Sequence, residues 1–254
     1  MAARVGIITG AASGIGAATA IEFARAGAKL VLASLPRDDI DGVVVRVTAA
    51  GGEAIPAHVD VRDAAALETL PQLALDRFGR LDFLVANAGV HHTSSVVGGD
   101  PERWRALIET NLLGSAFSVR AVLPTMIEQG SGDIVLMASI SGREIYVGAP
   151  IYLASKWGLV GFGHALRQEV APRGIRVTLV EPGMVDTPLT RLDASIRPLL
   201  EAAEPLQPED VARLVVYACM QPPHVVLSEL AIRPQRQPDV VAVGTGTAPD
   251  SETD

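Results

Sequence analysis

A phenol and an amine lie one helical turn apart in the second half of the chain. Tyr152 and Lys156 fall in a segment, 151–171, whose pattern predicts a helix. Positions i and i+4 of a helix share one face, so both side chains can approach the same ligand. A cation beside a phenol favours the phenolate and lowers its pKa from an ordinary value of about 10. The pair therefore predicts a proton carrier that works near neutral pH.

A serine hydroxyl is expected beside this pair. Ser139 follows the apolar run 133–138, which reads as a strand, and precedes Tyr152 by thirteen residues. Ligands of α/β proteins bind at the carboxyl ends of parallel strands, where a hydroxyl can donate to a substrate oxygen. Tyr146 lies off the i+4 face of Lys156, and we interpret it as a loop residue or a substrate contact.

A glycine-rich turn joins the first predicted strand, 4–9, to the first predicted helix, 15–26. Its glycines are Gly10, Gly14 and Gly16. Glycine permits a tight turn and a close approach of the backbone to a ligand. The amides at a helix N-terminus favour a negative group. This context predicts a site for the pyrophosphate of a dinucleotide.

The run Thr-Gly-x-x-x-Gly-Ile-Gly resembles the cofactor signature of the short-chain dehydrogenase/reductase family, and the resemblance continues to about residue 234. It implies that Tyr152 gives or takes the proton and that Ser139 orients the carbonyl. It further implies that Lys156 binds the nicotinamide ribose and tunes Tyr152, while Asn111 supports a water relay to Lys156. The expected activity is the interconversion of a carbonyl and a secondary alcohol by an NAD(P)-dependent oxidoreductase.

The same resemblance implies a set of cofactor contacts along the chain. One departure is Ala86, which stands where the family more often has asparagine. The expected contacts are Gly10, Ser13, Gly14, Ile15, Gly16, Ser34, Arg37, Asp60, Val61, Asn87, Ala88, Gly89, Tyr152, Lys156, Pro182, Gly183 and Thr187.

The end of the second predicted strand bears on the choice between NADP and NAD. Ser34 stands where an acid would accept from the ribose hydroxyls and repel a 2′-phosphate. Arg37 could pair with that phosphate, whereas Asp38 or Asp39 could bind the ribose. We expect NADP, with NAD as the alternative. The C-terminal part resembles an NADP-dependent subgroup that acts on 3-hydroxy acids, serine-like compounds and related carbonyls.

Strand-like and helix-like segments alternate from the first residues onward. Several strands are almost continuously apolar, as 133–138 is, which favours strands covered on both faces. We expect an α/β fold: a Rossmann-type, doubly wound parallel sheet of about seven strands with helices on both faces. One domain is expected over 1–234, and a disordered acidic tail over 235–254. Strands are predicted at 4–9, 29–33, 54–60, 82–86, 133–138, 176–181 and 225–232, and helices at 15–26, 41–50, 64–78, 101–129, 151–171 and 210–220.

Substrate contacts should come from the loops that follow the strands. Arg143 could pair with a substrate carboxylate, or it could be a solvated or intersubunit residue. The adjacent His91 and His92 lack a third metal ligand nearby in sequence, so no metal site is expected. The flexible-looking segment 186–203 could close over the substrate. The other candidates are Ser141, Glu144, Tyr146 and the stretch 184–200.

Composition narrows the classes of partner. The net charge is −8, of which the stretch 238–254 supplies −4 through four acids and no Lys or Arg, and aromatic residues make up only 4%. An acidic chain with few aromatic residues is a poor binder of nucleic acids or anionic membranes. We also expect no apolar segment of eighteen residues that could span a membrane. The single Cys219 excludes an internal disulfide. We expect a cytoplasmic protein with a small-molecule substrate and, by resemblance, a homotetramer or homodimer.

Two other functions compete with this interpretation. A dinucleotide-binding regulator or scaffold would bind the cofactor without turnover, but Ser139, Tyr152 and Lys156 argue against it. An epimerase or dehydratase acting on nucleotide sugars would need a longer substrate domain than the roughly twenty residues after Pro234 allow.

Overall fold

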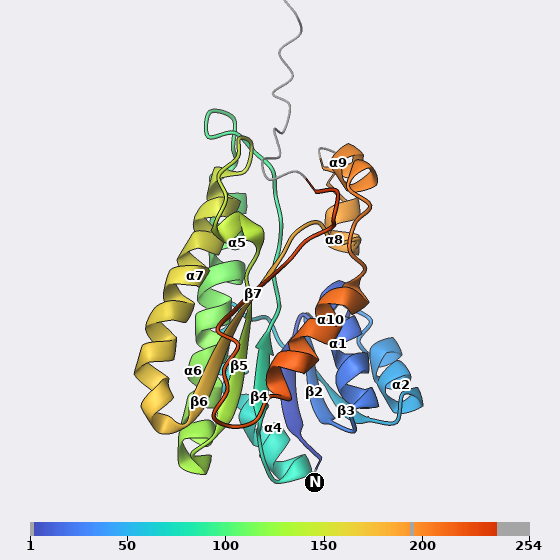
Figure 1. Ribbon diagram of the computed structural model, residues 1–254, viewed down its shortest axis with the longest axis vertical. Coiled ribbons are helices and arrows are strands. Elements are labelled where there is room, and N and C mark those ends of the chain that lie inside the picture. The colour runs from blue at the N-terminus through green and yellow to red at the C-terminus, as the bar shows by residue number, and fades with distance from the viewer. Residues whose placement is uncertain (1–2, 194–195, 238–254) are drawn as a thin grey trace, which may run out of the picture.

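Seven parallel strands form the sheet on which the molecule is built (Figure 1). The computed structural model describes residues 3–193 and 196–237, so the expected acidic tail lies outside the described residues except for 235–237. The strands are β1 (Val5–Thr9), β2 (Lys29–Ser34), β3 (Glu53–His58), β4 (Phe83–Ala86), β5 (Gly132–Met137), β6 (Ile175–Pro182) and β7 (Glu229–Ile232). The predicted fold class is confirmed.

The order of the strands creates a crevice. They lie as β3-β2-β1-β4-β5-β6-β7, and every neighbouring pair is parallel. The chain builds outward from β1 to β3 and then returns to the other side of β1 with β4. The chain segments that follow β1 and β4 therefore go to opposite faces of the sheet, and a crevice opens between them at the carboxyl ends of the two strands.

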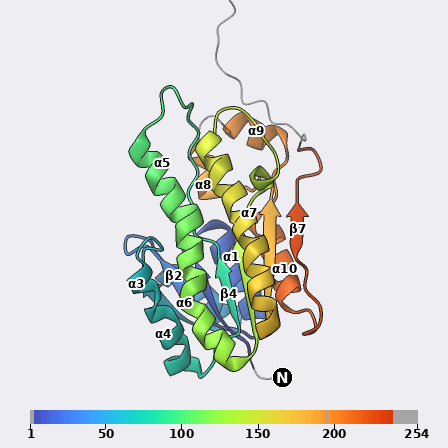
Figure 2. The ribbon, with the colours of Figure 1, turned by 90° about the vertical axis from the view of Figure 1, so that its left-hand side faces the viewer.

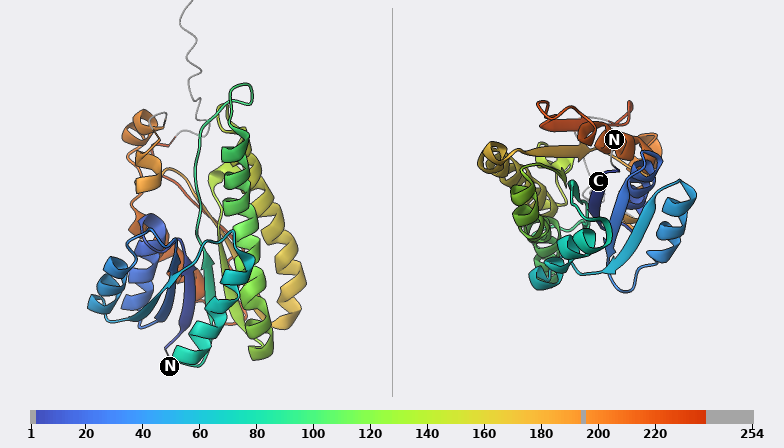
Figure 3. Two further views of the ribbon diagram at one scale, coloured as in Figure 1. Left: turned by 180° about the vertical axis from the view of Figure 1, so that it is seen from behind. Right: turned by 90° about the horizontal axis from the view of Figure 1, so that it is seen from below.

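Helices cover both faces of the sheet (Figures 1 and 3). Because β1 and β4 are buried at every position, they need apolar side chains on both faces. One face carries α1 (Gly14–Arg25), α2 (Asp41–Ala49) and α10 (Pro208–Cys219). The other carries α3 (Ala64–Leu67), α4 (Thr69–Phe78), α6 (Gly114–Gln129) and α7 (Pro150–Val170), which runs into a short 3₁₀ turn, η3 (Ala171–Arg173).

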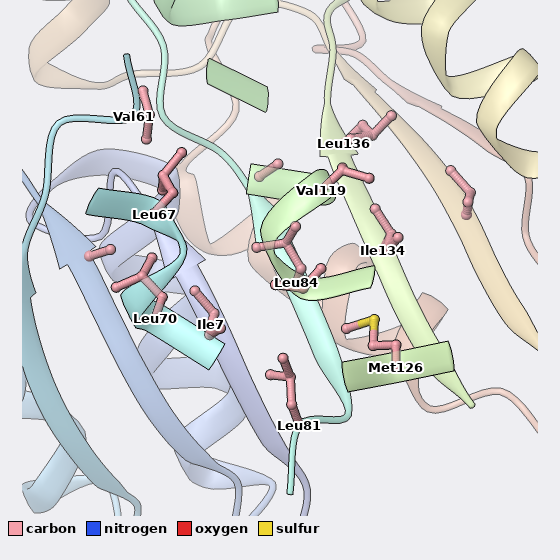
Figure 4. Close-up of a cluster of buried hydrophobic side chains, with 14 of the residues drawn as sticks. Ile7, Val61, Leu67, Leu70, Leu81, Leu84, Val119, Met126, Ile134 and Leu136 are labelled. Atoms are coloured by element: carbon pink, nitrogen blue, oxygen red, sulfur yellow. The ribbon is translucent and has the colours of Figure 1, made fainter. Parts of the chain in front are cut away.

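A hydrophobic core fills each side of the sheet. Figure 4 shows the side under α4 and α6, where Leu70 and Met126 pack with Leu84 of β4. On the opposite side the rings of Phe23 and Phe83 stack with centroids 4.1 Å apart, which ties α1 to β4. Burying one such side chain contributes about 1.5–3 kcal/mol, so the two cores hold the crevice-forming strands firmly in place.

A single helical rod runs from 101 to 129 along one face (Figure 2). It consists of α5 (Pro101–Ile108), a π-helical turn η1 (Glu109–Leu113) and α6. By length and composition alone the rod could cross a membrane, contrary to the expectation that no such segment exists. In this fold Val119, Val122 and Met126 of the rod pack into the core instead. The π-turn was not predicted, and such turns often mark functional sites.

Elsewhere the structure departs from the prediction in three places. The helix expected over 64–78 is two helices, because Asp63 caps the four-residue α3 and the chain restarts at Thr69. Strand β7 begins at Glu229 instead of at residue 225. Within the segment 186–203, expected to be flexible, the chain forms α8 (Pro188–Arg191), capped by Thr187, and α9 (Arg197–Ala202).

Ionic contacts close the amino-terminal edge of the sheet. Arg176 of β6 donates to both carboxylate oxygens of Asp133 on β5, at 2.5 and 2.9 Å. The same guanidinium donates to the carbonyls of Cys219 and Gln221, where α10 ends. Arg4 also pairs with Asp133. One arginine thus holds a strand pair and a helix terminus together away from the crevice.

We expect Arg176→Ala to lower the free energy of unfolding by about 2–4 kcal/mol, because Asp133 loses its forked partner and the Gln221 carbonyl loses its donor. The contacts of Arg4 with this cluster remain in the variant. Urea unfolding measures the change.

The control is Arg213→Ala, which removes an exposed pair with Asp210 on α10 and should cost less than about 0.5 kcal/mol. If both variants lost the same free energy of unfolding, the Arg176 contacts would contribute no more than an exposed ion pair.

Candidate active site

A long groove of about 520 Å³ follows the carboxyl ends of β1, β2, β4, β5 and β6. All the cofactor contacts expected from the sequence line it except Gly16. The groove begins beside Ser34 and Arg37, passes the glycine turn, and reaches Tyr152 and Lys156. Segments far apart in the sequence therefore share one elongated site of the kind a dinucleotide needs.

The glycine turn keeps the groove open. Gly10 and Gly14 have φ values of +63° and +52°, a region that favours glycine. A Cβ on Gly16 would lie 2.2 Å from the carbonyl oxygen of Gly10, so a side chain there would push α1 away from β1. Ser13 precedes α1 without a side-chain capping bond, which leaves the first-turn amides to an anionic ligand.

Asn87 supports this turn from the end of β4. Its amide donates to the carbonyls of Thr9 and Gly10, at 3.0 and 3.2 Å. In return the Thr9 hydroxyl accepts from the backbone N–H groups of Asn87 and Ala88. These bonds hold β1 to β4 where the strand order reverses, so the side chain of Asn87 also supports the glycine turn.

Two arginines stand at the far end of the groove. Arg37 lines it beside Ser34, as expected. Arg62, which sequence reasoning missed, also lines it and forms a forked pair with Asp60, with both Nε contacts at 3.0 Å. The hydrogen bond from Arg62 holds the pKa of Asp60 below its usual range against the opposing effect of burial. The position of Arg62, two residues after Asp60, was the only signal in the sequence.

Ser139, Tyr152 and Lys156 all line the groove. Ser139 caps a 3₁₀ turn, η2 (Ile140–Gly142), directly after β5. Lys156 Nζ lies 5.9 Å from the centroid of the Tyr152 ring and donates to the Met137 carbonyl at 2.9 Å. The predicted sharing of one helix face by Tyr152 and Lys156 thus places both beside the end of β5.

Burial sets the charge states of this pair. It raises the pKa of Tyr152 well above the ordinary 10, although a hydrogen bond with Ser139 acts in the opposite direction. Burial also lowers the pKa of Lys156 to about 8. The expectation that the amine lowers the pKa of the phenol is therefore wrong for the ligand-free site, because desolvation of the phenol is larger than the opposing effect of the hydrogen bond with Ser139. The phenol of Tyr152 is therefore protonated at neutral pH in this state.

Asn111 lies behind the groove and does not line it. The side chain sits in the π-turn, 1% exposed. It accepts from Val90 N at 2.8 Å and donates to Val90 O at 2.9 Å and to Ser155 Oγ at 3.2 Å. Asn111 therefore joins the loop after β4 to helix α7, which carries Tyr152.

A second, smaller chamber adjoins the groove at Ser139 and Tyr152, which line both. Among the substrate candidates, His91, Glu144 and Tyr146 line this chamber. Four further residues of the predicted set do so as well, namely Ser141, Met184, Thr190 and Ile196.

Arg143 does not line the chamber, so the suggested pairing with a substrate carboxylate is wrong for this structure. Its guanidinium instead donates to Glu181, at 3.0 Å, and to Glu229. Gln237 lines the chamber although it falls in the expected tail, and its side-chain oxygen accepts from Met184 N at 2.8 Å. Nothing in the sequence around Gln237 signalled this contact.

Comparisons with known proteins agree with this geometry. The family model described as short chain dehydrogenase matches residues 4–195. An uncharacterized oxidoreductase from Staphylococcus saprophyticus is 37% identical over 232 residues, which cover 91% of this chain and 97% of that protein.

Solved structures give the same result. An alcohol dehydrogenase from Thermococcus sibiricus complexed with 5-hydroxy-NADP superposes with a TM-score of 0.82 at 28% identity, covering 92% of this chain and 98% of that one. A short chain dehydrogenase from Mycobacterium paratuberculosis bound to NAD gives 0.81 at 30% identity, covering 90% and 96%. Both neighbours are similar to this chain over nearly its whole described length.

The titration of Lys156 can be observed directly, because the chain contains only two lysines, Lys29 and Lys156. In ligand-free protein we expect the ¹³Cε signal of Lys156 to titrate with a midpoint near pH 8, since burial disfavours the ammonium. The amine is then charged below that pH and neutral above it. The second signal, from Lys29, is the internal reference, and Lys156→Arg assigns the spectrum. A Lys156 midpoint above pH 10 would contradict the burial argument.

Proposed function

Because the chain belongs to the short-chain dehydrogenase/reductase family and is an NAD(P)-dependent oxidoreductase, we propose that it interconverts a small carbonyl compound and a secondary alcohol with Tyr152 as the proton carrier. The observation that carries this proposal is the position of Tyr152 and Ser139 at the junction of the long groove and the small chamber. A reaction between a groove-bound cofactor and a chamber-bound substrate would occur at that junction.

The groove suits a nicotinamide dinucleotide. Glycines at 10 and 14 give the backbone access that a pyrophosphate needs, and the first turn of α1 offers amides and a positive dipole end. Lys156 and Thr187 line the groove close to the junction. When bound there, the reduced nicotinamide supplies the hydride that a carbonyl carbon accepts.

The side chains of this chain would handle the proton. Ser139 donates a hydrogen bond to the carbonyl oxygen and holds it beside the phenol of Tyr152. As the oxygen gains negative charge, Tyr152 transfers its proton to it, and the charged Lys156 stabilises the phenolate that remains. Asn111 acts at one remove, by fixing the helix that carries Tyr152. Oxidation of the alcohol reverses these steps.

For the cofactor we propose NADP in preference to NAD. Ser34 ends β2 without a negative charge, and Arg37 lines the groove beside it. Arg62 is engaged by Asp60, so Arg37 is the better partner for a 2′-phosphate. Asp38 also lines this end and would serve the ribose hydroxyls of NAD in the alternative.

Replacing Tyr152 by Phe tests the reaction. We expect kcat/KM to fall by about 100- to 10,000-fold, the usual contribution of a positioned proton donor. The dissociation constant of the cofactor, measured by fluorescence titration, should change by less than about threefold. Tyr217→Phe is the matched control, since it makes the same change at a phenol on α10 that is 60% exposed and lines neither the groove nor the chamber, and it should keep wild-type turnover. Near wild-type turnover in the Tyr152 variant would remove this residue from the reaction.

Replacing Arg37 by Ala tests the cofactor preference. We expect the KM for NADPH to rise about tenfold, the equivalent of one charge-assisted contact, while the KM for NADH stays unchanged. Arg46→Ala, on the exposed side of α2, is the control. A wild-type enzyme that uses NADH better than NADPH would overturn the role given to Arg37.

A further inference from the structure

The chamber next to Tyr152 limits the size of the substrate. Its volume is about 100 Å³, and one water molecule needs at least ~10–15 Å³ of such space. The part of the substrate that projects beyond the reacting carbonyl therefore contains only a few heavy atoms. This reasoning rests on the proposed function, since the chamber is a substrate site only if Tyr152 is the proton carrier.

No lysine or arginine is among the described residues that line the chamber. The stretches outside the described part, 194–195 and 238–254, contain none either. One carboxylate, that of Glu144, does line it. A substrate carboxylate would therefore be buried beside an acid, without a cation to pair with.

Two arginines lie near the residues that line the chamber, and both already pair with carboxylates of the protein. Arg143 donates to Glu181 and Glu229. Arg233, which follows β7, forms an ion pair with Glu144 itself. Neither guanidinium can turn to a ligand without leaving a buried or half-buried carboxylate unpaired, which would be costly.

His91 does not supply a positive charge at neutral pH. Its ring meets the Tyr152 ring edge-on, with centroids 4.4 Å apart, and its Nδ1 lies 3.2 Å from Asp193 Oδ2. Burial lowers the pKa of His91 more than Asp193 raises it, and the nearby His92 and Lys156 lower it further. The imidazole is then neutral, and it can accept or donate a hydrogen bond without attracting an anion.

Uncharged hydrogen-bonding groups complete the lining. The hydroxyls of Ser141 and Tyr146 lie 3.0 Å apart, and both residues face the chamber. Two hydroxyls that share one hydrogen bond keep one hydrogen to donate elsewhere. A neutral oxygen on the substrate can accept it.

From these observations we propose that the chamber selects small uncharged carbonyl compounds with a second oxygen, such as vicinal diketones and hydroxyketones, and rejects oxo acids of the same size. The charge pattern of the wall thus opposes the hydroxy-acid chemistry that the C-terminal resemblance implies.

Two compounds of nearly equal shape test the selection. 2,3-Butanedione has a methyl group where pyruvate has a negatively charged carboxylate oxygen, and the two compounds are otherwise the same. Methyl pyruvate is the uncharged ester of the same acid. With the reduced dinucleotide that the enzyme prefers, we expect kcat/KM to favour butanedione over pyruvate by at least about 100-fold. Methyl pyruvate should behave like butanedione.

A pair of variants separates the effect of the chamber from the intrinsic reactivity of the compounds. Glu144→Gln removes the acid and leaves Arg233 without that partner, so the butanedione-to-pyruvate ratio should narrow by at least about tenfold. Glu204→Gln makes the same change in the exposed pair with Arg236, which lies outside the chamber, and should leave the ratio unchanged. Melting temperatures confirm that both variants are folded.

The outcomes are distinct. A wild-type enzyme that reduces pyruvate as well as butanedione overturns this inference but leaves the proposed function intact, and so does an unchanged ratio in folded Glu144→Gln. Failure of the proposed function would be recognised by a different result, because the Tyr152→Phe variant would then keep wild-type turnover. If the enzyme reduces none of the three compounds with either cofactor, the chamber is not the substrate site.

Discussion

The burial of Lys156 and the low hydration around the Tyr152 phenol govern the charge states of this site. Lys156 donates to the Met137 carbonyl, and burial disfavours the charged form of both side chains. Both groups therefore respond strongly to the charges that bound molecules bring. The phenol stays protonated in the ligand-free site beside an amine that is charged below about pH 8, which is the state that the proposed transfer of a proton from Tyr152 requires.

The parallel sheet is what brings these groups together. Ser139 follows β5, the glycine turn follows β1, and Tyr152 comes from a helix that packs on the same edge. Two asparagines then fix the positions of these segments. Asn87 bonds β4 to the end of β1, and Asn111 bonds the loop after β4 to α7. The amino-terminal edge, held by Arg176 and Asp133, contributes stability and no chemistry.

Local patterns predicted most of the fold and much of the lining of the groove. The glycine turn and the Tyr152–Lys156 spacing carry their geometry within a few residues, so the sequence alone located them. The contacts of Gln237 and of Arg143 depend on segments that meet only in the folded chain. Arg62 pairs with Asp60 only two residues away, but its place on the groove depends on the fold. The raised pKa of Tyr152 was missed because it comes chiefly from burial, which no spacing in the sequence encodes.

The account rests on the phenol of Tyr152 facing a substrate at the boundary between the groove and the chamber. A crystal structure with the oxidised dinucleotide and a small unreactive amide in place of the ketone measures this most directly. We expect the amide oxygen about 3 Å from the oxygen of Tyr152 and from that of Ser139, with the nicotinamide beside them. A nicotinamide bound elsewhere, or an amide that does not contact Tyr152, would contradict the account.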